Sequence, residues 1–361
     1  MRVHHFYPKT RNVGDHFVQR GIERMIREAV PAATFELFNV NSRGGDETGY
    51  GLTRETVERA NREADLVVVG GSNLYEGSLR WPWGVHLEAG ALERLRVPLF
   101  LLGLGTGSDF LSRVHRPSRR ARGEIRLLNE RADFSGVRDT LTLEWLRGLG
   151  VTKAQLTGDP ATFIFNRPAR GADEGEHVLV VTPPLRFWSG ASRFWRVRSR
   201  SRGRELFRAE VSLANALAES GQRVVVACND PSDLNLTRGL FGARFDGRVL
   251  CPQSPEEYFR LLSDSRAVVT GRLHTAVAAF SLGVPFLLID ADQRSHGFVE
   301  TYGLGGWALE PSRDFGARLS ERAARLLGGD ARAEWETLVR KRDLMRGRAS
   351  GLLRAALARV V

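Results

Sequence analysis

Residues 267–290 hold the side chains whose types and spacing best suit chemistry. An apolar run predicts a strand that ends at Thr270, followed by a helix that runs to about Leu282. Arg272 and His274 stand at the start of that helix, where free backbone N–H groups and the positive end of the dipole favour an anion. Arg272 adds a fork of donors, and His274 can move a proton near neutral pH. The spacing predicts an anion site beside an acid–base group.

A structural interpretation of the same residues competes with this one. In it the segment is a capped turn, Arg272 forms an ion pair and His274 is an interior histidine with its hydrogen bonds satisfied. The placement of Arg and His two residues apart at a strand-to-helix junction favours the functional interpretation. No Asp or Glu lies between Gly271 and Ile289. Many nucleotide-sugar transferases carry glutamates on the corresponding helix, so this composition argues against a nucleotide-sugar donor.

Three glycine-rich segments also follow predicted strands. In residues 12–15, Asp15 either caps the next helix or reaches a cleft to orient or deprotonate a sugar hydroxyl. Residues 70–73 can bring the backbone close to a ligand, and Asn73 offers both a donor and an acceptor. Residues 103–107 have glycines at alternate positions. This spacing does not match the G-x-G-x-x-G of a dinucleotide-binding fingerprint, so a tight turn is predicted there.

Length and composition indicate a folded chain of about two domains. The chain has 361 residues, 42% of them apolar and 26% charged. The net charge is +11, and only Lys9, Lys153 and Lys341 of the 53 basic residues are lysine. A GC-rich genome explains the arginine excess as well as an anionic partner does, whether a phosphate-bearing substrate, a membrane surface or nucleic acid.

The two cysteines, Cys228 and Cys251, form no C-x-x-C motif and no cluster with histidine. A disulfide scaffold and a structural zinc site are therefore not expected. Both cysteines fit a reducing compartment as small buried side chains. The patterns H-E-x-x-H, G-x-S-x-G and G-x-x-x-x-G-K-[ST] do not occur, so no metal site, nucleophile elbow or P-loop is expected.

Short β-rich runs alternate with amphipathic helical stretches, the pattern of parallel sheets covered by helices. The strands are expected at residues 3–7, 34–40, 66–69, 99–104, 134–137, 178–181, 224–227, 249–251, 267–269 and 284–289. The Pro-, Gly- and charge-rich residues 166–176 are typical of a linker. We therefore expect two Rossmann-like α/β domains facing each other across a cleft, residues 1–165 and 177–330, with an Arg-rich helical tail at 331–361. Ligands in such folds bind beyond the carboxyl ends of the strands.

Residues 186–208 contain eight arginines, with Phe187, Trp188, Phe194 and Trp195 among them. Arginine with aromatic residues fits nucleic acid, a flexible loop that contacts anionic lipid or a lipid-linked diphosphate, or a solvated loop. No recognisable nucleic-acid module accompanies the segment, so nucleic acid is not an expected partner.

No signal peptide is apparent at the N-terminus. The longest apolar run, residues 276–289, is short and is interrupted by Ser281, Gly283 and Pro285. We expect a cytoplasmic protein with peripheral contact at the inner face of the membrane.

The chain resembles the polysaccharide pyruvyl transferase family. The motifs that carry the resemblance span roughly residues 12–304 in the family's order. They are Asn12-x-Gly14-Asp15 with Gly21, Gly70-Gly71-Ser72-Asn73, Val137-Arg138-Asp139, Gly158-Asp159-Pro160, and, most specifically, Gly271-Arg272-Leu273-His274-Thr275 through Gly283-Val284-Pro285.

The resemblance implies a two-domain fold of the glycosyltransferase-B type, with the acceptor on the first domain and the donor on the second. It implies transfer of the enolpyruvyl group of phosphoenolpyruvate to two hydroxyls of a sugar in a polysaccharide or lipid-linked glycan precursor. Phosphoenolpyruvate is then a co-substrate, and the reaction needs no cofactor. The product is a pyruvate ketal. The implied roles are catalytic for His274 and Asp15, donor-binding for Gly271, Arg272, Thr275 and Arg294, and acceptor-binding for Asn12, Gly71, Ser72 and Asn73.

This chain departs from many relatives after Ile289, where they carry a Tyr and later a Lys. Here Asp290 follows, and Arg294 is expected to supply the cation.

Two other functions fit the same fold. A glycosyltransferase with a nucleotide-linked sugar donor would bind a nucleoside diphosphate and not phosphoenolpyruvate. A non-catalytic relative would bind anionic glycans or lipids without turnover. The presence of both Arg272 and His274 argues against the second of these alternatives.

Overall fold

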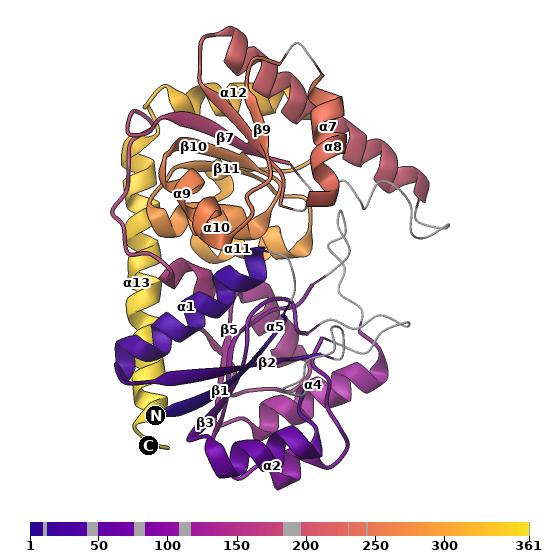
Figure 1. The fold of residues 1–361 in the computed structure, drawn as a ribbon, viewed down its shortest axis with the longest axis vertical. Coiled ribbons are helices and arrows are strands. Elements are labelled where there is room, and N and C mark those ends of the chain that lie inside the picture. Colours follow the sequence, from indigo (N-terminus) through magenta and orange to yellow (C-terminus); the bar gives the residue numbers. More distant parts are fainter. Residues whose placement is uncertain are drawn as a thin grey trace.

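The computed structural model describes residues 1–9, 13–41, 50–75, 84–107, 117–182, 196–229, 231–242 and 245–360. Two separate six-stranded sheets form its two halves (Figure 1), and every strand pair in them is parallel. The predicted fold class, two Rossmann-like α/β domains, is confirmed. Each predicted strand is present with its ends within two residues of expectation.

The first sheet has the strand order β2-β1-β3-β4-β5-β6. Its strands are β1 (Arg2–Tyr7), β2 (Thr34–Asn39), β3 (Leu66–Gly70), β4 (Leu99–Leu104), β5 (Phe134–Val137) and β6 (Gln155–Leu156). The accompanying helices are α1 (Val13–Ala29), α2 (Arg54–Glu63), α3 (Ala91–Arg94), α4 (Arg119–Arg131), α5 (Thr140–Gly148) and the short η1 (Pro160–Phe163). Strands β3 and β4 are buried along their whole length, as expected for parallel strands with both faces covered.

The second sheet has the order β12-β11-β10-β7-β8-β9. Its strands are β7 (His177–Val181), β8 (Val224–Ala227), β9 (Arg248–Leu250), β10 (Ser265–Thr270), β11 (Phe286–Ile289) and β12 (Ala308–Leu309). Its helices are α7 (Arg196–Glu219), α8 (Pro231–Phe241), α9 (Pro255–Ser263), α10 (Leu273–Leu282), α11 (Gln293–Tyr302), η2 (Gly305–Trp307), α12 (Phe315–Leu327) and α13 (Arg332–Leu357). The expected linker, residues 166–176, lies between η1 and β7.

Each sheet has a topological switch point, where successive strands are added to opposite sides. In the first sheet it lies between β1 and β3, and in the second between β7 and β10. Loops leave such neighbouring strands in opposite directions, which opens a crevice beyond their carboxyl ends. The carboxyl ends of these four strands are therefore where a ligand is expected.

Part of the Arg-rich segment is helical, which corrects the expectation of a flexible loop. Helix α7 begins at Arg196, and Leu206 and Phe207 on it are buried in the core of the second half. Further apolar residues, Leu213 and Ala214, follow at helical spacing and are buried too. This burial supports a helix that continues toward its arginine-rich start. Residues 183–195, which hold the rest of the segment, lie outside the described residues.

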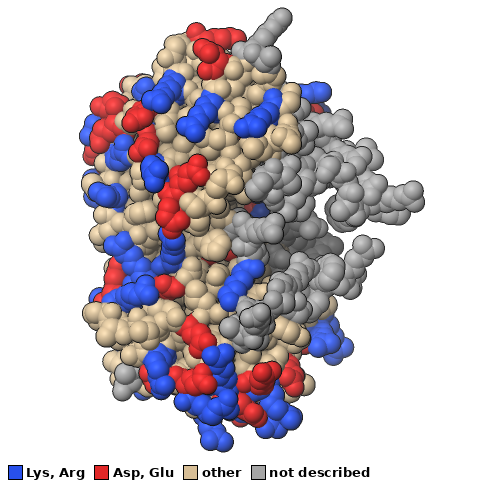
Figure 2. All heavy atoms as spheres, in the orientation of Figure 1, with Lys and Arg blue, Asp and Glu red and all other residues tan. Residues whose placement is uncertain are grey.

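The chain has a net charge of +11. On the face shown in Figure 2, the basic side chains form no single patch and are interspersed with acidic ones. Several arginines pair with a glutamate four residues away on the same helix, as in Arg59–Glu63 and Arg126–Glu130. Among the described residues, no helix is both long enough and apolar enough to cross a bilayer.

Helix α13 runs along the side of both halves and packs against α1, α11 and η1 (Figure 1). Its Arg342 is fully buried. The guanidinium donates to the carbonyl oxygens of Phe280 and Ser281 in the last turn of α10, and to that of Arg167 at 2.8 Å. The Phe280 carbonyl also accepts from the backbone of Gly283 (3.0 Å) and the Ser281 carbonyl from that of Arg167 (3.5 Å). Arg342 therefore adds a charged donor at the end of α10 and links it to the Arg167 carbonyl.

Replacing Arg342 tests this contact. Arg342→Met keeps an apolar stem but removes the charged donor shared by the carbonyls of Phe280, Ser281 and Arg167, and a hydrogen bond from a charged group contributes about 1.5–3 kcal/mol. We expect the free energy of unfolding in guanidinium chloride to fall by at least ~2 kcal/mol. Arg348→Met, on the exposed face of the same helix, should change it by less than about 0.5 kcal/mol. Equal losses in the two variants would contradict the assignment.

Candidate active site

The switch points of the two sheets meet at one close contact between α1 and α10. Gly14 lies in the first turn of α1, just after β1, and His274 lies in the first turn of α10, just after β10. A Cβ atom on Gly14 would lie 2.8 Å from His274 Cγ, closer than real side chains pack. Only glycine leaves room for the imidazole, so this contact joins the carboxyl edges of both sheets.

Arg272 spans the switch point of the second sheet. It is the N-cap residue of α10. Its backbone N–H donates to Thr270 Oγ1 at the end of β10 (2.9 Å), and its Nε donates to the carbonyl of Thr182 just beyond β7 (3.1 Å). Glu210 on α7 is fully buried. Burial raises the pKa of its carboxyl well above the usual range, and the positive charge of Arg272 offsets only part of this rise. The guanidinium therefore lies where an anion is expected in this fold.

His274 is neutral in the unliganded protein. Burial lowers its pKa to about 3, and the positive charges of Arg138 and Arg294 act in the same direction, against an opposing effect of Asp292. Its Nε2 atom is buried and has no hydrogen-bond partner within the described part of the chain. The expectation of a group that titrates near neutral pH is thus corrected for the unliganded state. A neutral imidazole is the form that can accept a proton.

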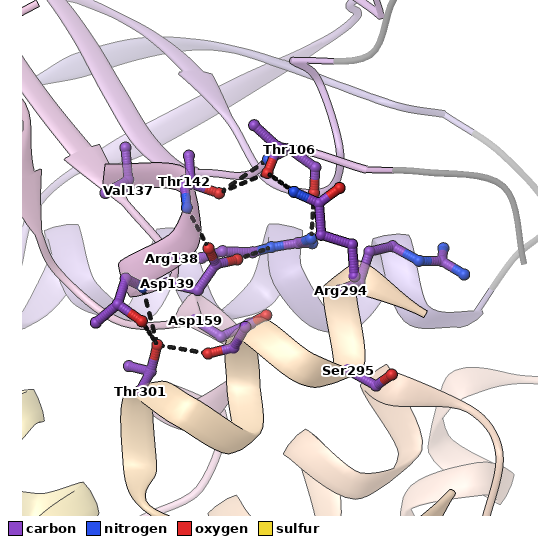
Figure 3. A network of polar contacts seen from close by, with 12 residues as sticks. Thr106, Val137, Arg138, Asp139, Thr142, Asp159, Arg294, Ser295 and Thr301 are labelled. Atoms are coloured by element: carbon purple, nitrogen blue, oxygen red, sulfur yellow. Dashed lines mark hydrogen bonds and ion pairs between the residues drawn. The ribbon is translucent and has the colours of Figure 1, made fainter. Parts of the chain in front are cut away.

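Arg138 is a site residue that the sequence analysis named only as part of a family motif. It directly follows β5 and is buried. Its Nε donates to Asp139 Oδ2 (3.0 Å) and its Nη2 to the carbonyl of Thr106 (3.1 Å), as Figure 3 shows. Its Nη1 is buried with no hydrogen-bond partner among the described residues. Its charge also lowers the pKa of His274, so the guanidinium offers an idle donor for an anion within electrostatic reach of the imidazole.

Hydrogen bonds across the two halves hold this region in place. Gln293 at the start of α11 donates from Nε2 to Thr106 Oγ1 (3.1 Å), beyond β4. The backbone N–H of Thr140 at the start of α5 donates to Thr301 Oγ1 on α11 (3.0 Å; Figure 3). Gln293 Oε1 is buried and has no partner in the described ranges. A second idle polar atom therefore lies in the same network as Arg138.

Arg294 sits in the first turn of α11 and is held by Asp292. The Asp292 carboxylate caps the helix by accepting from the backbone of Arg294 and Ser295 (both 3.0 Å), and it pairs with Arg294 Nε (2.9 Å). Burial opposes ionisation of Asp292, but Arg294 and these hydrogen bonds outweigh it and lower its pKa. In Figure 3 the Arg294 guanidinium extends away from Thr106 and Arg138. Its charge still reaches His274.

The other residues expected on the donor side have structural contacts. Thr275 is buried, and its Oγ1 lies 2.7 Å from the hydroxyl of Tyr258 on α9. Gly271 forms the turn between β10 and α10. Asp15, the expected second catalytic residue, is buried in the first turn of α1 beside Gly14. Asn12 lies outside the described residues.

The turn after β3 borders the switch point of the first sheet. Gly71 and Ser72 both adopt positive φ angles, 87° and 62°, and a Cβ on Gly71 would lie 2.7 Å from Val18 Cγ1 on α1. The carbonyl of Ser72 accepts from the backbone of Gly105 at 3.1 Å, which ties this turn to the end of β4. Asn73 Oδ1 is buried with no partner among residues that the structure describes. Gly71, Ser72 and Asn73 thus lie beside the switch point of the first sheet.

Within the described residues, two groups bring three metal-type ligand atoms within 4.8 Å of one another, namely His4, Glu36 and Glu63, and Asp290, His296 and Glu310. In the first group, Arg59 pairs with both glutamates, at 2.5 and 2.9 Å. In the second, Asp290 accepts from Ser295 Oγ and contacts His296 Nδ1, both at 2.9 Å. Asp290 and Asp292 have the spacing D-x-D, but Asp292 caps α11. Protein groups already engage these carboxylates, so we assign neither group as a metal centre.

The contact between Gly14 and His274 can be tested with one methyl group. Gly14→Ala places a Cβ against the imidazole and should displace it, so we expect at least a tenfold loss of transfer activity and a shifted His274 ring resonance in NMR spectra. Gly123→Ala on α4 is the matched control, because a Cβ there meets no atom within 4 Å. Activity unchanged in Gly14→Ala would rule out a catalytic role for this junction.

The neutral state of His274 predicts its titration. The imidazole resonances of His274, assigned by comparison with His274→Gln, should not shift between pH 8 and pH 5 in the unliganded protein. The unfolded chain should titrate near the ordinary value of 6.5. Because the unfolded chain then binds a proton that the folded chain does not, His274 should make the free energy of unfolding fall as the pH drops below about 6.5. A folded-state midpoint near neutral pH would contradict the burial described here.

Comparison with solved structures identifies the fold. The UDP-GlcNAc 2-epimerase of Neisseria meningitidis, bound to UDP-GlcNAc, aligns with a TM-score of 0.59 at 13% identity, covering 99% of this chain and 100% of that chain. The enzyme of the same name from Rickettsia bellii gives 0.55 at 13% identity, with 100% and 95% covered. Phytolacca americana UGT2, complexed with UDP-2-fluoro-glucose and pterostilbene, gives 0.51 at 12% identity, with 96% and 94% covered. These likenesses establish the two-domain fold of the glycosyltransferase-B type and nothing finer.

No curated protein matches the chain significantly. The family model for polysaccharide pyruvyl transferase matches residues 12–293, a range that includes Gly14, Arg138, Arg272, His274 and the start of α11. The chain is a transferase that belongs to the polysaccharide pyruvyl transferase family.

Proposed function

We propose that this protein transfers the enolpyruvyl group of phosphoenolpyruvate to two hydroxyls of one sugar, in a polysaccharide or lipid-linked glycan precursor. The product is a cyclic pyruvate ketal, and phosphate is released. The observation that carries the proposal is the pair of idle buried atoms, Arg138 Nη1 and His274 Nε2, beside the contact that joins the two switch points. Guanidinium groups next to a neutral imidazole suit a donor substrate that is small and strongly anionic.

The donor needs partners for a phosphate and a carboxylate but none for ribose. Arg138 and Arg272 supply guanidinium donors, and the first turn of α10 supplies backbone N–H groups with the positive end of its dipole. Arg294 adds positive charge from α11. Helix α10 carries no acidic residue, which supports a donor without a nucleotide.

The charge state of His274 supports an order of proton transfers. The imidazolium of His274 donates a proton to the methylene carbon, which becomes a methyl group. The first sugar hydroxyl then bonds to the neighbouring enol carbon, and its proton passes to Nε2 of the now neutral imidazole. The anionic donor favours this imidazolium by placing negative charge beside it. The second hydroxyl attacks the same carbon, and phosphate leaves with the electron pair of the C–O bond. The second proton goes to the phosphate or, through the acceptor side, to Asp15.

The acceptor would lie on the first half, over residues that border its switch point. Gly71, Ser72 and Asn73 form the turn there, and Asn73 Oδ1, which has no partner among the described residues, would accept from a sugar hydroxyl. The role expected of Asn12 stays a prediction, because that residue lies outside the described part of the chain. The expected peripheral contact with an anionic membrane involves residues 186–208 and also stays a prediction. Residues 186–195 of that segment lie outside the described part of the chain.

A thermal-shift comparison tests the donor. Phosphoenolpyruvate should raise the melting temperature of the folded protein, since a ligand that binds only the native state stabilises it, whereas UDP-GlcNAc and UDP should not. Arg138→Met should abolish most of that shift. His274→Gln should keep it but lower kcat for phosphate release by about 10²–10⁴-fold with a competent sugar acceptor. Arg348→Met, on the exposed face of α13, should match the wild type in both assays. Stabilisation by UDP and none by phosphoenolpyruvate would replace this proposal with a nucleotide-sugar transferase.

A further inference from the structure

The two cysteines of the chain lie side by side at the carboxyl edge of the second sheet. Cys228 directly follows β8 and Cys251 directly follows β9, and the last paired residues before them are Ala227 and Leu250. The pairing continues one step further, because the backbone N–H of Cys228 donates to the carbonyl of Leu250 at 3.0 Å. Neighbouring strands are about 4.8 Å apart, within the range of about 4.4–6.8 Å that Cα atoms of a disulfide span.

The Cys228 side chain is directed toward the strand that carries Cys251. Its Sγ lies 3.6 Å from the carbonyl oxygen of Leu250, the group that forms the peptide bond to Cys251. Both cysteines are buried and neither is in a disulfide. Cys251 Sγ lies 3.8 Å from the carbonyl oxygen of Pro252. The fold thus places two cysteines that are far apart in the sequence at the ends of neighbouring strands.

This cysteine pair is connected to the start of α10 by hydrogen bonds. Asn229, the residue after Cys228, accepts through Oδ1 from the hydroxyl of Tyr258 at 3.0 Å. The same hydroxyl lies 2.7 Å from Oγ1 of Thr275, which directly follows His274. A displacement of Cys228 toward Cys251 therefore moves the residue that positions Tyr258 against the first turn of α10.

We propose that Cys228 and Cys251 form a reversible disulfide by exchange with low-molecular-weight disulfides such as oxidised glutathione, and that the bridge loosens the Asn229–Tyr258–Thr275 contact. One cysteine thiolate attacks the glutathione disulfide, whose S–S bond breaks, giving a mixed disulfide and one glutathione thiolate. The second cysteine thiolate attacks the mixed disulfide and releases the second glutathione. Both cysteine sulfurs are oxidised, both glutathione sulfurs are reduced, and the two protons of the thiols end on glutathione.

Thiol counting tests the bridge. The full-length protein is incubated with oxidised glutathione, denatured, and titrated for thiols, and its peptides are mapped by mass spectrometry. We expect both thiols to be lost, no glutathione to be retained, a peptide pair joined through Cys228 and Cys251, and full recovery with dithiothreitol. In Cys251→Ser, the exchange reaction should stop after its first step, with glutathione bound to Cys228 through a mixed disulfide. Two intact thiols, a stable adduct in the wild type, or cross-linked dimers in place of the internal bridge would overturn the proposal.

Amide hydrogen exchange tests the connection to α10 without any donor, so its outcome is independent of the proposed transferase reaction. Exchange in residues 273–282 should become several-fold faster in the oxidised wild type and return to its original rate on reduction. Glutathione-treated Cys251→Ser should not show the change. In Tyr258→Phe, which lacks the connecting hydroxyl, the bridge should form without altering the exchange. Unchanged exchange in the oxidised wild type would refute the connection.

Discussion

The close approach of α1 to α10 is the constraint on which the candidate site depends. Each parallel sheet has one crevice at its switch point, and a transferase of this fold needs both crevices to face one space. Because Gly14 has no Cβ atom, the His274 side chain can pack against the first turn of α1. Helix α13 supports the arrangement from outside, because Arg342 binds the end of α10 while the same helix packs against α1.

Charge explains why this space suits an anion. Arg138 is buried with one donor atom that has no partner among the described residues. Burial lowers the pKa of His274, and the charges of Arg138 and Arg294 act in the same direction. Like charges brought together in a partly buried space repel, and an anion bound among them relieves that repulsion. In the proposed reaction, that anion would favour the protonated imidazole by placing negative charge beside it. Binding of the donor and proton transfer would then be coupled through the charges of a few side chains.

The fold by itself would not have distinguished this function from others. Two UDP-GlcNAc 2-epimerases, and UGT2 complexed with UDP-2-fluoro-glucose and pterostilbene, share the architecture at 12–13% identity, and one scaffold can host many reactions. The family match and the residues at the two switch points narrow the choice. An α10 without acidic residues and an arginine directly after β5 provide binding groups for a small anion rather than a ribose.

The sequence by itself determined the two α/β halves, because apolar runs with the burial pattern of parallel strands are a local property of the chain. Only β6 and β12, of two residues each, were missed, since they are too short to show any periodicity. The sequence also placed Arg272 and His274 at a helix start, because the strand–turn–helix pattern around them is continuous. It did not determine the charge state of His274, which depends on burial and on arginines far away in the chain.

Which glycines and charged residues lie together depends on how distant strands and helices pack. The glycines at 103–107 suggested a tight turn, but Gly105 is needed because a Cβ there would overlap the Arg138 side chain. Arg138 itself, the Gln293–Thr106 hydrogen bond and the Cys228–Cys251 pair all join residues from different strands or helices. Such pairs depend on strand order and register, and a single sequence carries no local signal of either. The Gly14–His274 contact depends further on how the two sheets and their helices pack against each other. The apolar surface that is buried between the two halves determines that packing.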